Sequence, residues 1–144
     1  MTGGMRTVLG AVFLLCFAFG GTALYGCGDQ AKLDGTSWTV RSWSASSLDP
    51  ADFTITASFA DGRIGGTSAV NHYGGSYAAT TAGGFSVGDL ASTEMAGPEP
   101  AMRAETIYLR LLRRAREYRL ANDQLTLLDG GGQELLVFVP RAER

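Results

Sequence analysis

Short segments in which apolar and polar residues alternate, separated by glycine-rich turns, most limit how this chain can fold. In residues 36–43 (TSWTVRSW) and 53–59 (FTITASF), apolar side chains recur at every second position. This period is typical of a β-strand with one buried face, because successive side chains of a strand point to opposite sides. Further strands are predicted at 63–70, 76–80, 85–90, 117–121, 124–129 and 133–140.

The sequences between these segments are typical of tight turns. Asp61-Gly62 and Asn122-Asp123 predict hairpin turns, and glycine runs at 83–84 and 130–132 also let the chain reverse. Gly65-Gly66 lies inside a predicted strand, where a glycine pair indicates a bulge or sharp coiling. Strands joined in succession by tight turns favour an antiparallel sheet.

Residues 97–118 (GPEPAMRAETIYLRLLRRAREY) instead have the spacing of an amphipathic helix. Pro100 near the first turn and Glu99 at the positive end of the helix dipole mark its start. Its apolar stripe consists of Ala101, Ala104, Tyr108, Leu111, Leu112 and Ala115. The order of elements predicts a mainly β (α+β) fold, in which a strongly curved, barrel-like antiparallel sheet packs against one α-helix.

Much of the remaining helix surface carries arginine, at positions 103, 110, 113, 114 and 116. One interpretation is a surface that rests on anionic lipid headgroups. The other, which we favour, is a solvated helix face partly paired through Glu99/Arg103 and Arg113/Glu117 at i,i+4 spacing.

The first 26 residues are typical of an export signal. Arg6 precedes an apolar run from Val8 to Phe19, which is too short for a membrane span of about 20 residues. An uncleaved anchor is the alternative. The sequence Leu24-Tyr25-Gly26-Cys27 resembles a bacterial lipobox, which implies diacylglycerol transfer to Cys27 and cleavage after Gly26. We therefore expect a signal peptide at 1–26, a lipid-anchored tether at 27–34 and a domain at 35–140, held on the extracytoplasmic side of a bacterial membrane.

Cysteine, histidine and net charge exclude several classes of site. Cys16 lies in the segment to be removed and Cys27 carries the lipid, so the mature domain has neither a free thiol nor a disulfide. One histidine without cysteine does not make a typical zinc site, and we expect no metal and no cofactor. The net charge of −2 lacks the basic surplus of a nucleic-acid-binding protein.

The only histidine stands in residues 68–80, SAVNHYGGSYAAT. Catalysis by His72 would need a partner that orients it, and although Ser68, Ser76 and Asp61 are available, no nucleophile-elbow motif is present. We favour a turn built by Asn71 and the glycine pair 74–75, with two tyrosines packed near the sheet rim. The candidate interaction loop comprises Asn71, His72, Tyr73 and Tyr77.

Several segments together resemble the META domain of HslJ-like heat-shock lipoproteins. They are LDGTSWTV, FADGRIGGTSAVNHYGGSY, LASTEMAG, the helix with Glu105, and YRLANDQLTLLD followed by LLVF, and they span Leu33 to Phe138. Two cysteines of the family pattern are replaced by Val70 and Gly97, which implies that these positions are close in space. The resemblance also implies a barrel-like fold with one helix, no established catalytic residue, and a link to envelope stress.

Three functions compete. The leading hypothesis is a non-catalytic, lipid-anchored envelope protein that acts by protein interaction in envelope stress or maintenance. Its expected partners are the membrane, through lipid on Cys27, and an unidentified envelope protein, with no nucleic acid and a monomeric state. A lipocalin-like module for a small apolar ligand is the alternative, and an enzyme is the third. An enclosed apolar cavity would favour the ligand-binding module, and a side-chain-filled interior the leading hypothesis.

Overall fold

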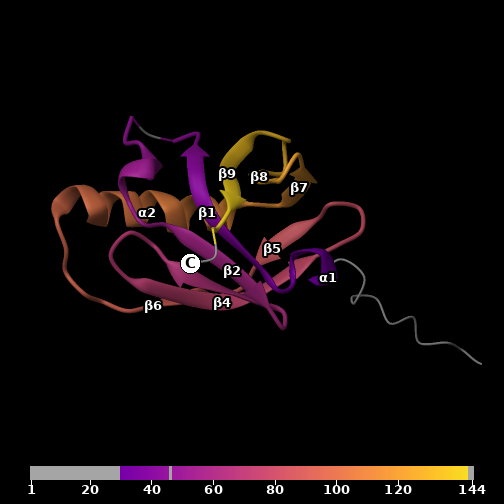
Figure 1. Ribbon diagram of the computed structural model, residues 1–144, viewed down its shortest axis with the longest axis horizontal. Coiled ribbons are helices and arrows are strands. Elements are labelled where there is room, and N and C mark those ends of the chain that lie inside the picture. The colour runs from indigo at the N-terminus through magenta and orange to yellow at the C-terminus, as the bar shows by residue number, and fades with distance from the viewer. Residues whose placement is uncertain (1–29, 46, 143–144) are drawn as a thin grey trace, which may run out of the picture.

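The computed structural model describes residues 30–45 and 47–142 (Figure 1). The expected signal peptide, 1–26, and Cys27 lie outside the described residues. The helices are α1 (Gln30–Leu33) and α2 (Glu99–Arg114), with a 3-10 turn at Pro50–Asp52. The strands are β1 (Thr36–Trp43), β2 (Thr56–Ala60), β3 (Arg63–Thr67), β4 (His72–Ala79), β5 (Phe85–Val87), β6 (Ala91–Ser92), β7 (Glu117–Ala121), β8 (Gln124–Leu128) and β9 (Glu134–Pro140). No helix in this part of the chain is long and apolar enough to cross a membrane.

The strands form one antiparallel sheet that curls into a nearly closed barrel. Their order is β5-β4-β3-β2-β1-β9-β8-β7, and β6 pairs with β4 off this path. The two ends of the sheet meet where Gly84 bridges Glu117. At this seam the Phe85 N–H donates to the Arg116 carbonyl at 2.8 Å, and the Tyr118 N–H donates to the Gly83 carbonyl at 2.8 Å. The predicted fold class is therefore confirmed.

The hairpin turns agree with the sequence, and several strand limits do not. Asp61-Gly62 and Asn122-Asp123 have positive φ at both residues, as two-residue hairpin turns require. The predicted strand at 53–59 begins instead at Thr56, and before it Ile55 makes only an isolated bridge to Ser68. Of the bulge or sharp coiling predicted at Gly65-Gly66, the bulge is absent, since β3 keeps an uninterrupted register with β4. Register shifts occur instead in β1, between Val40 and Ser42, and in β8.

Helix α2 covers the core with the predicted stripe. Five of the six stripe residues are fully buried, namely Ala104, Tyr108, Leu111, Leu112 and Ala115. The Tyr108 ring stands edge-on to Phe138 of β9, with ring centroids 6.5 Å apart. On the exposed side, Arg103 pairs with Glu99 at 2.5 Å as expected. Arg116 donates to the carbonyls of Arg113 and Ala115. These carbonyls lie at the C-terminal end of the helix, where no N–H of the helix is available to donate to them.

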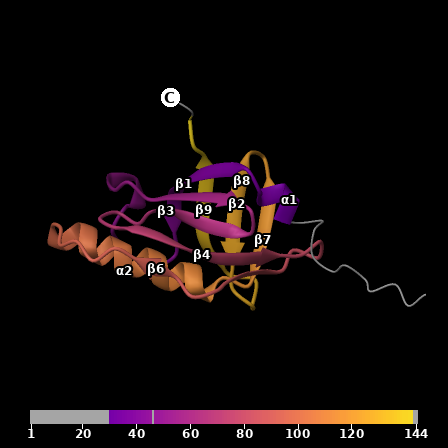
Figure 2. The same cartoon turned by 90° about the horizontal axis from the view of Figure 1, so that it is seen from below.

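The folded domain begins earlier than position 35. Residues 30–33 form α1, and the Leu33 side chain is fully buried in the core. The Gly35 N–H donates to the Phe59 carbonyl at 2.7 Å, and the Thr36 hydroxyl donates to the Leu33 carbonyl. The segment expected as a tether, 27–34, therefore includes residues that belong to the domain. Figure 2 shows α1 beside the strands at one end of the molecule, with the N-terminal end of α2 at the other.

Candidate functional site: a buried polar network beneath an exposed segment

A carboxylate on the buried side of α2 forms the centre of a polar network. Glu105 is only 8% exposed. Its Oε2 accepts hydrogen bonds from the Ser68 hydroxyl and the Asn71 N–H, both at 2.8 Å, and its Oε1 accepts one from the Asn71 side-chain amide at 2.8 Å. These three donors are neutral, so the charge is stabilised by hydrogen bonds alone.

The donors come from a tight loop between β3 and β4. The Ser68 N–H donates to the Asn71 carbonyl at 2.8 Å, which closes the loop on itself, and the Ser68 hydroxyl oxygen lies 3.0 Å from the same carbonyl while its single proton goes to the shorter bond with Glu105. Ala69 takes the left-handed conformation, with φ of 84°. The turn predicted around Gly74-Gly75 is therefore wrong, because the reversal occurs at 68–71 and both glycines lie within β4.

Asn71 connects this loop to the segment that precedes α2. Its Oδ1 accepts from the Met95 N–H at 2.7 Å and from the Thr93 hydroxyl at 2.8 Å. Its amide nitrogen donates to the Met95 carbonyl at 3.2 Å. The backbone of His72 and Thr93 adds a further bond, from the Thr93 N–H to the His72 carbonyl at 3.0 Å. The Asn71 side-chain amide thus bonds to both the N–H and the carbonyl of Met95, as the backbone of a neighbouring strand would.

The network is bonded to the backbone of a segment whose residues are exposed to solvent. All residues from 91 to 96 are exposed, and the Met95 side chain is 53% exposed. We call these six residues the exposed segment 91–96. Met95 and Leu120 are the large hydrophobic side chains exposed in the described part of the chain.

Burial and hydrogen bonding act in opposite directions on Glu105. Burial raises the pKa of its carboxyl group, but the hydrogen bonds from Asn71, Ser68 and the Val70 backbone outweigh it, so the pKa lies below the ordinary value. Glu105 is therefore charged at neutral pH. A buried carboxylate whose oxygens already accept bonds from the protein is suited to ordering the backbone, and less to reacting with a substrate.

Two tyrosines extend the polar interior next to this network. The Tyr73 hydroxyl donates to the Thr56 carbonyl at 2.9 Å, and the Tyr108 hydroxyl lies 2.6 Å from that of Tyr73. Because the Tyr73 proton is used by Thr56, Tyr108 donates to Tyr73. Burial raises the pKa of both hydroxyl groups, so both remain protonated.

The residues of the predicted interaction loop are mostly inside the protein. Asn71, Tyr73 and Tyr77 are 2%, 5% and 4% exposed, and the Tyr77 ring stands edge-on to Phe59 with centroids 4.8 Å apart. Only His72 is exposed, and it is the first residue of β4 and not a loop residue. The side chains of Asn71, Tyr73 and Tyr77 therefore do not form a binding surface.

Sequence reasoning did not identify Glu105 as part of a site, although one signal was present. Glu105 lies four residues after Ala101 and three before Tyr108, on the apolar stripe. A charged residue at a stripe position must find buried partners. The proximity implied for Val70 and Gly97 is supported, because a Cβ placed on Gly97 would lie 3.5 Å from the Val70 Cβ.

The barrel interior is filled by side chains. Tyr108, Phe59 and Phe138 are among its largest fully buried residues. One depression on the described surface, with a volume of about 770 Å³, is open to solvent and is lined by residues 35–38 and 140–142. The described residues contain no cluster of three or more His, Cys, Asp or Glu side chains placed to hold a metal ion.

Comparison with known proteins places these features in a family. The sequence matches the META domain over residues 31–142. The structure is similar to the NMR structure of a protein from Burkholderia xenovorans, with a TM-score of 0.65, 27% identity, and coverage of 80% of this chain and 88% of the other. It is also similar to a DUF4847 family protein from Bacteroides vulgatus, with a TM-score of 0.58, 13% identity, and coverage of 81% and 100%. No curated protein matches the sequence.

The last similarity concerns the fold alone, whereas the family match spans most of the chain and the whole barrel. The chain belongs to the META domain family.

Proposed function

We propose that this protein is a non-catalytic, lipid-anchored module of the bacterial cell envelope, which binds another envelope protein through the exposed segment 91–96. The observation that carries the proposal is that a buried charge and the whole side chain of Asn71 are used to fix the backbone of a segment exposed to solvent. A surface segment ordered before binding loses less conformational entropy when a partner docks.

Met95 supplies an apolar contact on this segment. Its side chain is 53% exposed, while its N–H and carbonyl are both bonded to Asn71. Methionine adapts its shape to a partner, and it is common at binding surfaces. The side-chain-filled interior favours this function over the lipocalin-like module, because an apolar ligand would have to displace core residues such as Phe59 and Tyr108.

The envelope anchor rests on Leu24-Tyr25-Gly26-Cys27 after the apolar run. Its test is Cys27→Ser in cells fed a clickable fatty acid. The variant should take up no acyl label and should accumulate as unprocessed precursor. Equal labelling of the variant and the parent chain would remove the anchor from the proposal.

Binding through the exposed segment is tested by a photo-crosslinking amino acid at position 95, in cells, with the same amino acid at Leu120 as the control. Position 95 should give a discrete adduct with an envelope protein, and Leu120 should not. Glu105→Gln, which loosens the network without changing the surface, should weaken the adduct at 95. Equal protein adducts at both positions would contradict the proposal.

A further inference from the structure

We infer that the end of the barrel formed by α1 and the tip of the β7–β8 hairpin lies against the lipid bilayer, with Leu120 at the lipid interface and the exposed segment 91–96 turned away from it. The inference rests on the proposed anchor at Cys27. Beyond the anchor itself, it states which face of the domain lies on the membrane and which face points away from it.

The short chain between Cys27 and α1 limits how far the domain can stand from the membrane. Leu33 is fully buried and α1 is joined to the barrel through the bonds of Gly35 and Thr36 described above. Three residue steps separate Cys27 from Gln30, where α1 begins. A fully extended chain spans at most about 3.6 Å per residue, so these steps reach about 10 Å. An acyl chain on Cys27 therefore brings α1 to the membrane surface.

The surface beside α1 carries an exposed apolar side chain. Lys32 of α1 lines one shallow depression together with Trp38 and residues 120–124 of the β7–β8 hairpin. Leu120 is 37% exposed there, and it is one of the two large hydrophobic side chains exposed in the described residues. The turn at Asn122-Asp123 has positive φ at both residues, which keeps the hairpin tip tight. An apolar side chain therefore stands at the end of the domain that the anchor reaches.

The charges at this end of the domain indicate whether its contact with the bilayer depends on anionic lipid. Lys32 and Asp123, which line this depression, carry opposite charges, and Asp34 follows two residues after Lys32, so these three side chains have no positive surplus that attracts anionic headgroups. A single leucine does not hold a protein on a bilayer, and it contributes only when acyl chains supply the attachment. The contact should therefore form on neutral phosphatidylcholine as well as on anionic lipid.

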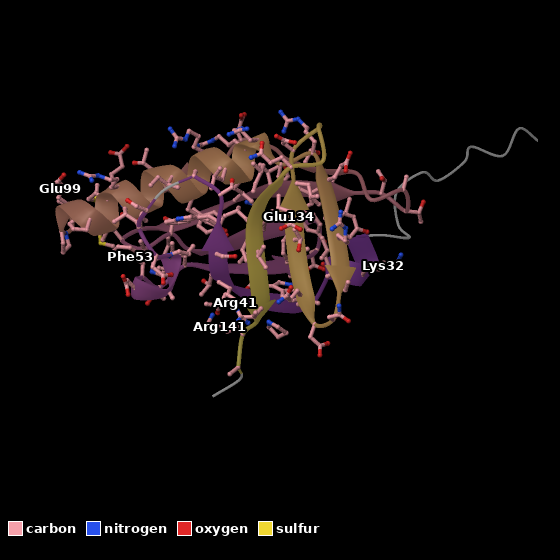
Figure 3. All side chains as sticks on the ribbon, turned by 90° about the horizontal axis from the view of Figure 1, so that it is seen from above. Lys32, Arg41, Phe53, Glu99, Glu134 and Arg141 are labelled. Atoms are coloured by element: carbon pink, nitrogen blue, oxygen red, sulfur yellow. The ribbon has the colours of Figure 1, made fainter. Side chains whose placement is uncertain are left out.

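The exposed segment 91–96 lies toward the end of the domain opposite α1. Lys32 and Glu99 lie at opposite ends of the domain (Figure 3). The exposed segment 91–96 leads into α2 at the Glu99 end, as the loop between β6 and α2 in Figure 1 shows. When α1 meets the bilayer, the network-supported segment faces away from it, where a protein partner has access.

The test uses the acylated protein in vesicles. Because the mature chain contains no cysteine besides Cys27, Leu120→Cys and Met95→Cys each provide one free thiol for an NBD fluorophore. Met95 is the matched control, since it is the other exposed large hydrophobic residue. Each labelled protein is reconstituted in phosphatidylcholine vesicles with and without 5-doxyl phosphatidylcholine as a shallow quencher.

The label at position 120 should lose several times more fluorescence to the lipid quencher than the label at position 95, in neutral and in anionic vesicles alike. Equal quenching at the two positions, or stronger quenching at 95, would overturn the inference. Acyl labelling of the same preparations separates the two proposals: unacylated protein would overturn the anchor, whereas acylated protein without selective quenching at 120 would overturn the orientation alone.

Discussion

Joining Val70 to Gly97 by a disulfide is the sharpest test of how the loop before β4 meets the segment before α2. A Cβ built on Gly97 would lie 3.5 Å from the Val70 Cβ, within the range of about 3.5–4.5 Å found across disulfides. Gly97 does not have a positive φ, so its backbone accepts a side chain. The double variant Val70→Cys with Gly97→Cys should therefore oxidise in the folded state.

The expected gain follows from the loop that is closed. About 26 residues lie between the two positions, and the chain-entropy model gives about 3 to 4 kcal/mol for such a loop. For a domain of this size that corresponds to a rise in melting temperature of roughly 10 to 15 °C. The gain is measured between the oxidised and reduced forms of the same double variant, so that the loss of the Val70 methyl groups cancels.

A matched pair of variants shows whether the contact has the described geometry. The Cβ of Gly97→Ala would lie 2.8 and 2.9 Å from the two Val70 γ-carbons, which should cost about 1 to 3 kcal/mol through overpacking. The same change in a Val70→Ala background should cost clearly less. Non-reducing gels, thiol titration and urea unfolding are the assays. Two free thiols in folded, air-oxidised protein would refute the arrangement.

Three further predictions concern single residues, each measured by the free energy of unfolding. His72→Ala should cost less than about 1 kcal/mol because the side chain is exposed, and a larger loss would give His72 a structural role. Glu105→Gln should cost about 2 kcal/mol, since an amide cannot accept all the bonds of the carboxylate. The pKa of Glu105 is lowered in the folded state, so its contribution to the free energy of unfolding is complete above the unfolded pKa of about 4.3 and is lost as the pH falls from there. The difference in the free energy of unfolding between the parent protein and Glu105→Gln should therefore narrow in acid. A difference that does not change with pH would mean that Glu105 is not ionised. Gly66→Ala should cost more than about 2 kcal/mol, because its Cβ would lie 2.3 Å from the Thr56 carbonyl oxygen, whereas Gly74→Ala, with its nearest contact at 3.6 Å, serves as the mild control.

The sequence predicted those strands and helices whose limits follow from the regular spacing of apolar residues. β1 was expected at 36–43 and has those limits, because Trp38 and Val40 are buried while Ser37 and Arg41 on either side are exposed and Thr39 between them is half-buried. The α2 stripe was predicted for the same reason. The start of β4 was missed because Gly74-Gly75 was interpreted as a turn. A Cβ on Gly75 would lie 2.6 Å from the Asp89 carbonyl oxygen, so this glycine allows another segment to pass close by.

The candidate site was less predictable, because its bonds join residues far apart in the chain. Asn71 was expected to stabilise its own turn, and its loop does close locally. The bonds to Glu105 and Met95 cross 34 and 24 residues, and no local pattern reports such a distance. The position of Glu105 on the apolar stripe indicated that it is buried, but not which donors it would meet.

The pairing of β1 with β9 has a consequence for how the chain folds. Thr39 lies beside Val139, so the first long strand completes its hydrogen bonds only with the last one. Contacts between distant parts of a chain slow folding, because the entropy of closing the intervening loop is lost before the contact contributes. During synthesis the β9-facing edge of β1 stays open until nearly the whole domain has emerged. Truncation before Glu134 should therefore prevent the barrel from closing at all, and not merely shorten it.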